Sequence, residues 1–391
     1  MKQLEINQMI QRQTPEFLHT IWPNFKKVAF AIYDENDVYV FHHPKFPNEQ
    51  YFKIPKDERF IADGLLIFED YPTAIVDKNR YETFPQLMAI VVHELFHGFQ
   101  YLQDEKRFPN EISGVMYTED AQNIAYRVKE RALLADAILL KNEFEKLQAL
   151  KQFIAIRKKR AILFSEFVQY EQLMESIEGP AFYCELKTYL LVTNQTVDDV
   201  FHLYGKSLID AKESMLAIRK SCYDSGLFIC LALDKWRPDW KEQFFDEQLT
   251  VFELLEQIGD FNIDVEVECN EDAYTIAEIM NQHKEQQVQQ FFNNNNYLVE
   301  IKGPLKITSV DPMNMTHWHD NVLHKHFVKI KLQEKEVTLL QPVLTRICDG
   351  DLWHISSIQF YSTEKPTVKR NKHIIRELGE IDTASYQVAV K

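Results

Sequence analysis

The amino-acid sequence predicts an α+β protein in which strands come first, helices follow, and a smaller β-rich module ends the chain. Three observations support this order. Short runs of β-branched and aromatic residues fill the N-terminal part, as is typical of strands. From about residue 118 to 189 the chain is rich in Leu, Ala, Glu, Lys and Arg, which favour helices. After a mostly polar run over 286–296, apolar and polar residues alternate.

The first strands are predicted from apolar runs that polar turn residues separate. Residues 27–33 and 38–41 flank the sequence Asp-Glu-Asn-Asp and indicate a β-hairpin. Residues 60–68 and 73–76 are two further runs of strand type. The N-terminal region is therefore expected to form a small sheet.

A helix is expected to follow this sheet and to reach about Leu102. Thr83 and Gln86 have the spacing of a capping box, in which each side chain bonds the backbone N–H of the other residue. Pro85 lies in the first turn, where a missing N–H costs nothing. The apolar stretch that follows predicts that this helix is largely buried.

The region from about 118 to 189 is expected to be helical with one interruption, at Gly179-Pro180. We expect two long antiparallel helices over about 118–165, then a third that begins near Leu163. Shorter helices are expected at 208–219, 225–235 and 250–257.

The polar run that ends in four asparagines is the expected domain boundary. Residues 1–285 would form one domain, with the helices of 118–165 as an insertion, and residues 297–391 a smaller β-rich module. The strands of this module are expected at 298–302, 322–332, 336–340, 343–347 and 353–361.

Composition disfavours several functions. The formal net charge of −15 repels nucleic acid and anionic lipid, and neither is an expected partner. The densest basic run, from Arg157 to Arg160, lies in a predicted helix and is interpreted as a solvated face. The glycines are too widely spaced for a dinucleotide-binding or P-loop motif. The five cysteines include no CxxC pair, and the N-terminus has no apolar leader, so a cytoplasmic protein is expected.

The strongest functional signal is the sequence His-Glu-Leu-Phe-His over 93–97. In a helix, His93 and His97 lie one turn apart on the same face, so both imidazoles can bind one metal ion. Glu94 points to a neighbouring position, from which its carboxylate can reach a water beside the metal. A catalytic zinc site usually has three protein ligands, so a third ligand must come from elsewhere in the chain.

A second motif, Glu-Gly-Pro-Ala-Phe-Tyr over 178–183, suggests where that ligand lies. With these two motifs, residues 60–185 resemble the gluzincin branch of the zinc metallopeptidases, which includes thermolysin and the zinc aminopeptidases. The resemblance implies a zincin-like fold with Glu178 as the third zinc ligand, and Glu175, one turn earlier, is the alternative. The chain departs from the family in the long spacing between the motifs. It also lacks the Gly-x-Met-Glu-Asn motif of the aminopeptidases, and Phe182 replaces the acidic residue one turn after the ligand.

The resemblance implies hydrolysis of peptide bonds in a peptide or protein substrate, with Zn²⁺ as the cofactor and Glu94 as the general base. It also implies a Tyr or His that stabilises the oxyanion. Tyr223 is our choice for this donor, with His202 and Tyr204 as rivals. Arg219, one helical turn before Tyr223, could bind a substrate carboxylate, although a surface salt bridge is the favoured interpretation. An extended peptide commonly pairs with an edge strand beside a zincin active site, and 73–76 is a candidate for this rim strand, with an ordinary buried strand as the alternative.

Four histidines in the C-terminal module form a separate group. With a two-residue turn at Asp320-Asn321, His319 would pair with Val322 and His317 with His324. Two or three imidazoles would then share one sheet face and could bind a second metal; a polar surface ladder is the alternative. The histidines are His317, His319, His324 and His326.

Two other functions remain open at this point. The protein could be a catalytically degenerate zincin-fold protein that binds a partner through residues 297–391. It could also be a zinc hydrolase that cleaves an amide in a small molecule rather than a peptide.

Overall fold

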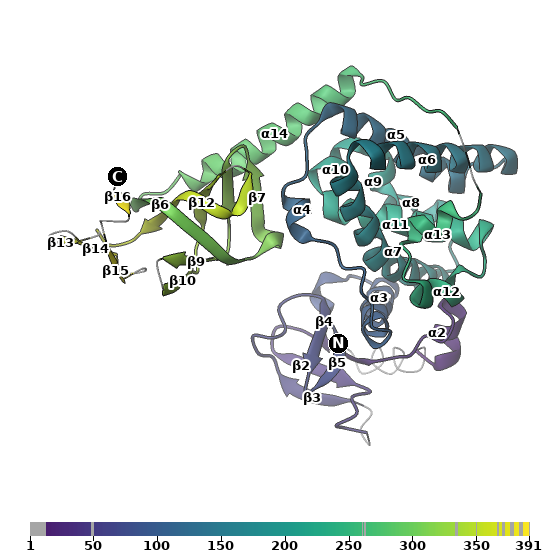
Figure 1. The fold of residues 1–391 in the computed structure, drawn as a ribbon. Coiled ribbons are helices and arrows are strands. Elements are labelled where there is room, and N and C mark those ends of the chain that lie inside the picture. Colours follow the sequence, from purple (N-terminus) through teal and green to yellow (C-terminus); the bar gives the residue numbers. More distant parts are fainter. Residues whose placement is uncertain are drawn as a thin grey trace. The chain divides into compact units, whose positions relative to one another are not determined.

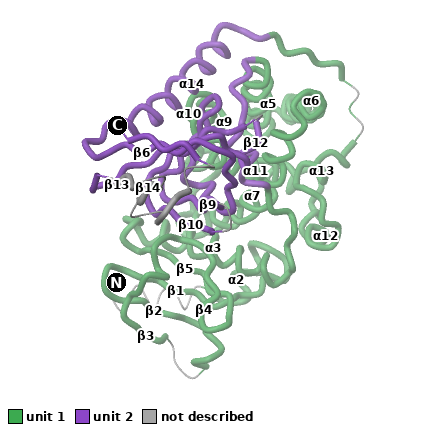
Figure 2. The backbone as a smooth tube through the Cα atoms, turned by 60° about the vertical axis from the view of Figure 1, so that its left-hand side comes forward, with its two compact units in different colours: residues 1–109, 122–268 green, residues 110–121, 269–391 purple. Residues whose placement is uncertain are grey.

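The computed structural model describes residues 13–47, 51–259, 261, 263–332, 335–348, 350–365, 367–369, 372–375, 379–382 and 386–390. The chain forms two compact units (Figure 2). Unit 1 comprises residues 1–109 and 122–268, and unit 2 comprises 110–121 and 269–391. The sequence predicts a domain boundary between 285 and 297, whereas the units divide at 268/269 and the short segment 110–121 also belongs to unit 2.

Unit 1 begins with a helix and a five-stranded mixed sheet of order β3-β2-β1-β5-β4 (Figure 1). Its elements are α2 (Pro15–Ile21), β1 (Ala29–Tyr33), β2 (Asp37–Phe41), β3 (Phe52–Pro55), β4 (Gly64–Phe68) and β5 (Tyr71–Asp77). The predicted hairpin is confirmed, since β1 and β2 are antiparallel neighbours. Strand β5 is parallel to β1 and antiparallel to β4. The expectation that 73–76 forms a rim is wrong, because β5 lies inside the sheet and β4 is the edge.

Helix α3 (Phe84–Leu102) packs against β5 and β4 and carries the first motif. The predicted capping box is confirmed. The Thr83 hydroxyl accepts a hydrogen bond from the backbone N–H of Gln86, and the Gln86 side chain accepts one from the backbone N–H of Thr83. The apolar face of α3 belongs to the main core of unit 1, where Phe96 packs edge-on against Trp22 with 4.7 Å between ring centroids. Burial of this face fixes the rotation of α3 about its axis, and therefore the direction of its polar side chains.

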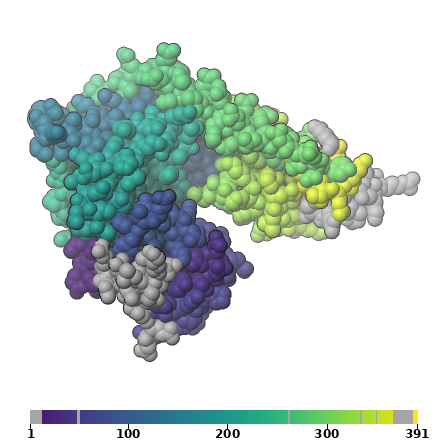
Figure 3. Space-filling view, turned by 180° about the vertical axis from the view of Figure 1, so that it is seen from behind, coloured from purple at the N-terminus to yellow at the C-terminus, as the bar shows by residue number. Residues whose placement is uncertain are grey.

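The helices expected between 118 and 189 are present. Helices α5 (Ala121–Leu139) and α6 (Glu143–Leu163) precede α7 (Ser165–Thr193). The expected interruption is wrong, because α7 continues through Gly179 and Pro180. The remaining helices of unit 1 are α8 (Val197–Tyr204), α9 (Lys206–Ile209), α10 (Ala211–Leu216), α11 (Ile218–Trp236), α12 (Trp240–Glu247) and α13 (Val251–Glu256), and a 3-10 turn covers Lys78–Arg80. In the space-filling view of Figure 3, the side chains of these helices, coloured blue to teal, form a continuous surface.

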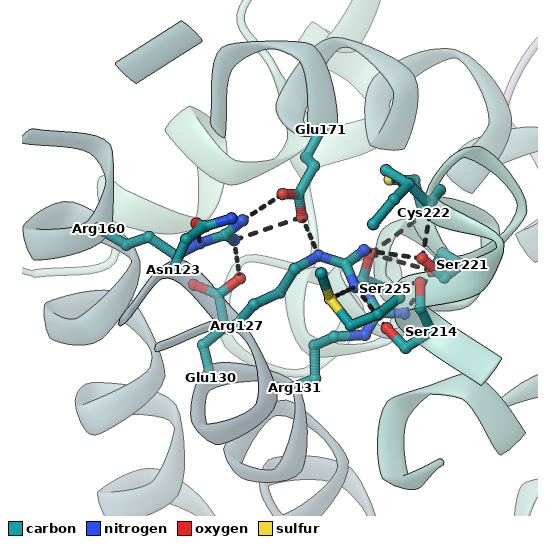
Figure 4. Close-up of polar contacts among 12 residues, drawn as sticks. Asn123, Arg127, Glu130, Arg131, Arg160, Glu171, Ser214, Ser221, Cys222 and Ser225 are labelled. Carbon is teal, nitrogen blue, oxygen red and sulfur yellow. Dashed lines mark hydrogen bonds and ion pairs between the residues drawn. The ribbon is translucent and has the colours of Figure 1, made fainter. Parts of the chain in front are cut away.

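The basic run in α6 is not a solvated face. Arg157 and Arg160 are fully buried, whereas Lys158 is exposed and Lys159 is half-buried. Arg160 pairs with Glu130 of α5 at 2.6 Å and with Glu171 of α7, as Figure 4 shows. The interpretation is therefore wrong for both arginines, because carboxylates from neighbouring helices neutralise them inside the helical layer.

Unit 2 is built on an antiparallel sheet of order β10-β9-β6-β12-β11-β8-β7, with β16 also paired to β6. Its elements are α4 (Glu111–Val115), α14 (Glu271–Phe291), β6 (Tyr297–Val310), a 3-10 turn (Pro312–Asn314), β7 (Met315–Trp318), β8 (Asn321–His324), β9 (Val328–Leu332), β10 (Lys335–Leu339), β11 (Val343–Cys348), β12 (Asp351–Ser362), β13 (Thr367–Lys369), β14 (Lys372–Ile375), β15 (Gly379–Asp382) and β16 (Gln387–Val390). Strands β13–β15 form a separate small sheet. Ile112 and Met116, from the segment 110–121, pack against the apolar core of the larger sheet. The mixed α+β class and the C-terminal sheet are thus confirmed.

Candidate metal centre

Three helices of unit 1 bring the candidate residues together. Helix α3 packs against α7, and α7 packs against α11. The crossing of α7 and α11 is very close, because glycines face each other there. A Cβ placed on Gly226 would lie 2.6 Å from the carbonyl oxygen of Glu175 and 2.7 Å from the Cα of Gly179. This crossing lies next to Glu178 in the sequence, so it places the first turns of α11 beside that carboxylate.

The side chains of His93, His97 and Glu178 converge. The two Nε2 atoms of the histidines are 3.1 Å apart. The Oε2 atom of Glu178 lies 3.3 Å from Nε2 of His97 and 3.7 Å from Nε2 of His93. Among the described residues, this is the one group of three such side chains whose atoms could jointly hold a metal ion.

The other ring nitrogen of each histidine has its own partner. Nδ1 of His93 lies 2.9 Å from a carboxylate oxygen of Glu185, on α7. Nδ1 of His97 lies 2.7 Å from the side-chain oxygen of Gln100, whose amide in turn donates to the carbonyl of Ile177. Acceptors at Nδ1 favour, in each neutral imidazole, the tautomer whose Nε2 carries no hydrogen, and the two Nε2 atoms are directed at the same point.

Glu178 has a different neighbour on each carboxylate oxygen. Oε2 faces the histidines and has no hydrogen-bond partner among the described groups. Oε1 accepts a hydrogen bond from Arg219 at 3.0 Å, and the same guanidinium also donates to the hydroxyl of Tyr223. The Tyr223 ring is stacked at 6.3 Å from the imidazole of His93. The predicted oxyanion donor therefore lies at the edge of the metal-binding group.

Glu94 lies beside this group and is 6% exposed. Its Oε2 atom also has no hydrogen-bond partner among the described groups. Burial raises the pKa of Glu94 above its usual value, although the neighbouring His93 and His97 act in the opposite direction. A buried carboxylate with a raised pKa and a free oxygen is suited to accept and return a proton.

Electrostatics within the group favour a charged carboxylate among imidazoles. Burial raises the pKa of Glu178, but His97 and His93 outweigh burial and hold that pKa well below the usual range. Burial lowers the pKa of His93, yet the nearby carboxylates of Glu178 and Glu185 raise it overall, to about 10. The same negative charges that attract a proton to these imidazoles would attract a metal cation.

The alternatives from the sequence lie elsewhere. Glu175 is fully buried and is held by Arg157 at 2.9 Å and by the hydroxyl of Ser225 at 2.6 Å, outside the metal-binding group. His202 is exposed on α8. Tyr204 is buried and packs against Phe182 with 5.0 Å between ring centroids. The structure thus brings Glu178 to the histidines and Tyr223 to Glu178.

The four histidines of unit 2 do not converge among the described residues. The hairpin turn is at His319-Asp320, one residue earlier than predicted, so His317 pairs with Val322. The predicted register is therefore wrong. The buried His324 bonds the hydroxyl of Thr345 at 3.1 Å, while the exposed His326 lies 3.1 Å from a carboxylate oxygen of Asp311.

Sequence reasoning missed the roles of three residues. Glu185 lies seven residues after Glu178 on the same helix, and two turns place both carboxylates on one face. Gln100 lies three residues after His97, the spacing of neighbouring side chains on a helix. These spacings could have suggested both contacts. The bond from Arg219 to Glu178 joins two helices and has no comparable local signal.

Comparison of this chain with protein-family models, with curated proteins and with solved structures finds no match. Among the described residues, no helix combines the length and the apolar character needed to cross a membrane.

Proposed function

We propose that the protein is a zinc-dependent metallopeptidase of gluzincin type, with a zincin-like N-terminal unit, that cleaves peptide or protein substrates. The observation that carries the proposal is the convergence of His93, His97 and Glu178 next to the buried, partly unpartnered carboxylate of Glu94. A His₂Glu donor set with an adjacent general base is typical of this class.

The distances within the group suit zinc. A tetrahedral ion with bonds of about 2.0–2.1 Å requires its ligand atoms to be about 3.3 Å apart. The three separations here are 3.1, 3.3 and 3.7 Å. The Oε2 atom of Glu178, which has no hydrogen-bond partner among the described groups, points at the two imidazole nitrogens, as it would toward a shared cation. These residues therefore fit the metal, with a fourth position for water or substrate.

The bound zinc ion would polarise a substrate carbonyl and lower the pKa of a water molecule. Glu94 would accept the proton of the attacking water and then return it to the leaving amine. The Tyr223 hydroxyl would donate to the developing oxyanion. Glu185 and Gln100 would hold the histidine rings in the tautomer that presents Nε2.

Strand β4 favours an extended peptide as the substrate. Among the described strands it pairs only with β5, so its other edge has no neighbouring strand there, and it packs beside α3. Half of the Ile67 side chain is exposed on this strand. A peptide that adds to the edge would gain main-chain hydrogen bonds and run beside the helix that carries Glu94.

The decisive experiment combines metal analysis with cleavage. Purified wild-type protein is compared with Glu178→Ala, Glu175→Ala and Glu94→Gln for zinc content and for cleavage of a peptide library. We expect the wild-type protein to bind one zinc per chain, and we expect Glu178→Ala to be the one variant of the three that loses it. Glu94→Gln should retain zinc but lose cleavage. A wild-type protein that binds no zinc when the ion is supplied would refute the proposal.

A further inference from the structure

A single guanidinium bridges the candidate third ligand and the candidate oxyanion donor. Arg219 donates through one terminal nitrogen to Oε1 of Glu178 at 3.0 Å and through the other to the hydroxyl of Tyr223. The guanidinium also lies against the Tyr223 ring, 5.5 Å from its centroid. We propose that Arg219 is a positioning residue that keeps Glu178 bound to the metal through one oxygen and fixes the hydroxyl of Tyr223. This inference rests on the proposed function.

The first part follows from the two oxygens of Glu178. Carboxylates can bind a metal through one oxygen or both, and the second oxygen would fill the position that water or substrate needs. Arg219 holds Oε1, while Oε2 faces the imidazoles of His93 and His97. Because Glu178 is 6% exposed, water has little access to replace this guanidinium. Arg219 therefore favours a four-coordinate metal with an open position.

The second part follows from the geometry of the guanidinium. The planar guanidinium holds its N–H groups at fixed angles to one another. A hydrogen bond through one terminal nitrogen therefore constrains the direction of the hydrogen bond through the other. Arg219 and Tyr223 are one turn apart on α11, and Glu178 belongs to α7. By bonding both, Arg219 places the phenol oxygen relative to the ligand carboxylate rather than only relative to its own helix. A lysine carries the same charge and has three N–H groups, but all three are on one rotatable nitrogen, so it does not reproduce this fixed planar geometry.

The test uses the full-length protein with three single variants. Arg219→Ala removes the bridge, and Arg219→Lys keeps the charge but not the planar guanidinium. Lys220→Ala is the matched control, since it removes one positive charge from the next residue of α11, which is exposed. Each variant is loaded with Co²⁺, whose visible absorption is intense in four-coordinate sites and weak in sites with more ligands. Metal affinity is measured by competition with a chelator.

We expect Arg219→Ala to keep its metal, with an affinity loss of about 10–100-fold, and to show weaker Co²⁺ absorption. We expect kcat to fall by about 100-fold or more, with KM changed only a few-fold, because the donor is misplaced while the substrate site remains. Arg219→Lys should recover part of the metal affinity but little of kcat. Lys220→Ala should match the wild type in every measurement.

A double-mutant cycle with Tyr223→Phe isolates the bridge. If Arg219 acts through the hydroxyl, Arg219→Ala costs much less kcat in the Tyr223→Phe background than in the wild type. Two results would overturn the inference while leaving the proposed function intact. One is that the losses of kcat in Arg219→Ala and Tyr223→Phe simply add in the double variant. The other is that Arg219→Ala and Lys220→Ala have the same Co²⁺ spectrum. A wild-type protein that binds neither Zn²⁺ nor Co²⁺ would overturn both, and this result is distinguishable because it needs no variant.

Discussion

The close crossing of α7 and α11 makes Gly226→Ala a demanding test of the structure. In a helix interior, replacing Gly by Ala normally stabilises by about 1 kcal/mol, because the unfolded chain loses freedom and the helix gains a better former. At Gly226 the added methyl group would lie 2.6 Å from the carbonyl oxygen of Glu175 and 2.7 Å from the Cα of Gly179. Both atoms are backbone, so no side-chain rotation can relieve the contact.

The expected magnitude follows from these distances. Nonbonded carbon atoms sit about 3.5 Å apart or more, so the added methyl group and the Cα of Gly179 must separate by about 0.8 Å. Overpacking of this kind costs about 1–3 kcal/mol and outweighs the gain in helix propensity. The same shift moves Tyr223 and Arg219 away from Glu178, and a misplacement of about 1 Å can reduce kcat by about 100-fold.

Urea denaturation of Gly226→Ala and Gly179→Ala, alone and combined, measures the effect. Each single variant should be less stable than the wild type, and the double variant should lose less than the sum, because one methyl group already separates the helices. Zinc content should stay near the wild-type value, since His93, His97 and Glu178 are not on α11. An increase in stability for Gly226→Ala would refute the close crossing.

Three further predictions concern other parts of the chain. Glu185→Gln should weaken zinc binding by about 10–100-fold in chelator competition, because Nδ1 of His93 loses its carboxylate partner. Arg157→Ala should reduce the free energy of unfolding in urea by about 3–5 kcal/mol, since it leaves buried Glu130 and Glu175 without this cation. Burial lowers the pKa of His324 from 6.5 to about 4, so the unfolded chain binds more protons between these values. Stability should therefore fall as the pH drops from about 6.5 to 4, by up to about 3 kcal/mol at about 1.4 kcal/mol per pH unit, and His324→Gln should lose this dependence in urea titrations at pH 7, 5.5 and 4.5.

Local features of the fold were predictable because their causes lie within a few residues. Thr83 and Gln86 bond each other's backbone as their spacing predicts, and Thr250 with Glu253 does the same at α13. The N-terminal hairpin likewise depends on a short polar turn. Each signal reports a hydrogen bond or turn that forms within one segment, so tertiary packing had little opportunity to override it.

The errors share a different cause, which is contact between distant segments. Arg157 and Arg160 look solvated in their own helix, and carboxylates on other helices, those of Glu130, Glu171 and Glu175, allow their burial. The position of residues 73–76 inside the sheet depends on pairing with two other strands, which no local pattern specifies. In the candidate site, helical spacing predicted the pairing of the histidines, whereas the bridge from Arg219 depends on how α11 crosses α7.

The assignment of residues 110–121 to unit 2 has a consequence for biosynthesis. The first strand of that unit's sheet, β6, begins at Tyr297, so about 180 residues must be made after α4 before the sheet can start to form. At a synthesis rate of about 5–20 residues per second, this delay lasts about 9–36 s. During that time Ile112 and Met116 have no apolar core to join, although the preceding α3 can already pack on its own sheet. The nascent chain therefore carries an early exposed segment that only the last third of the protein can bury.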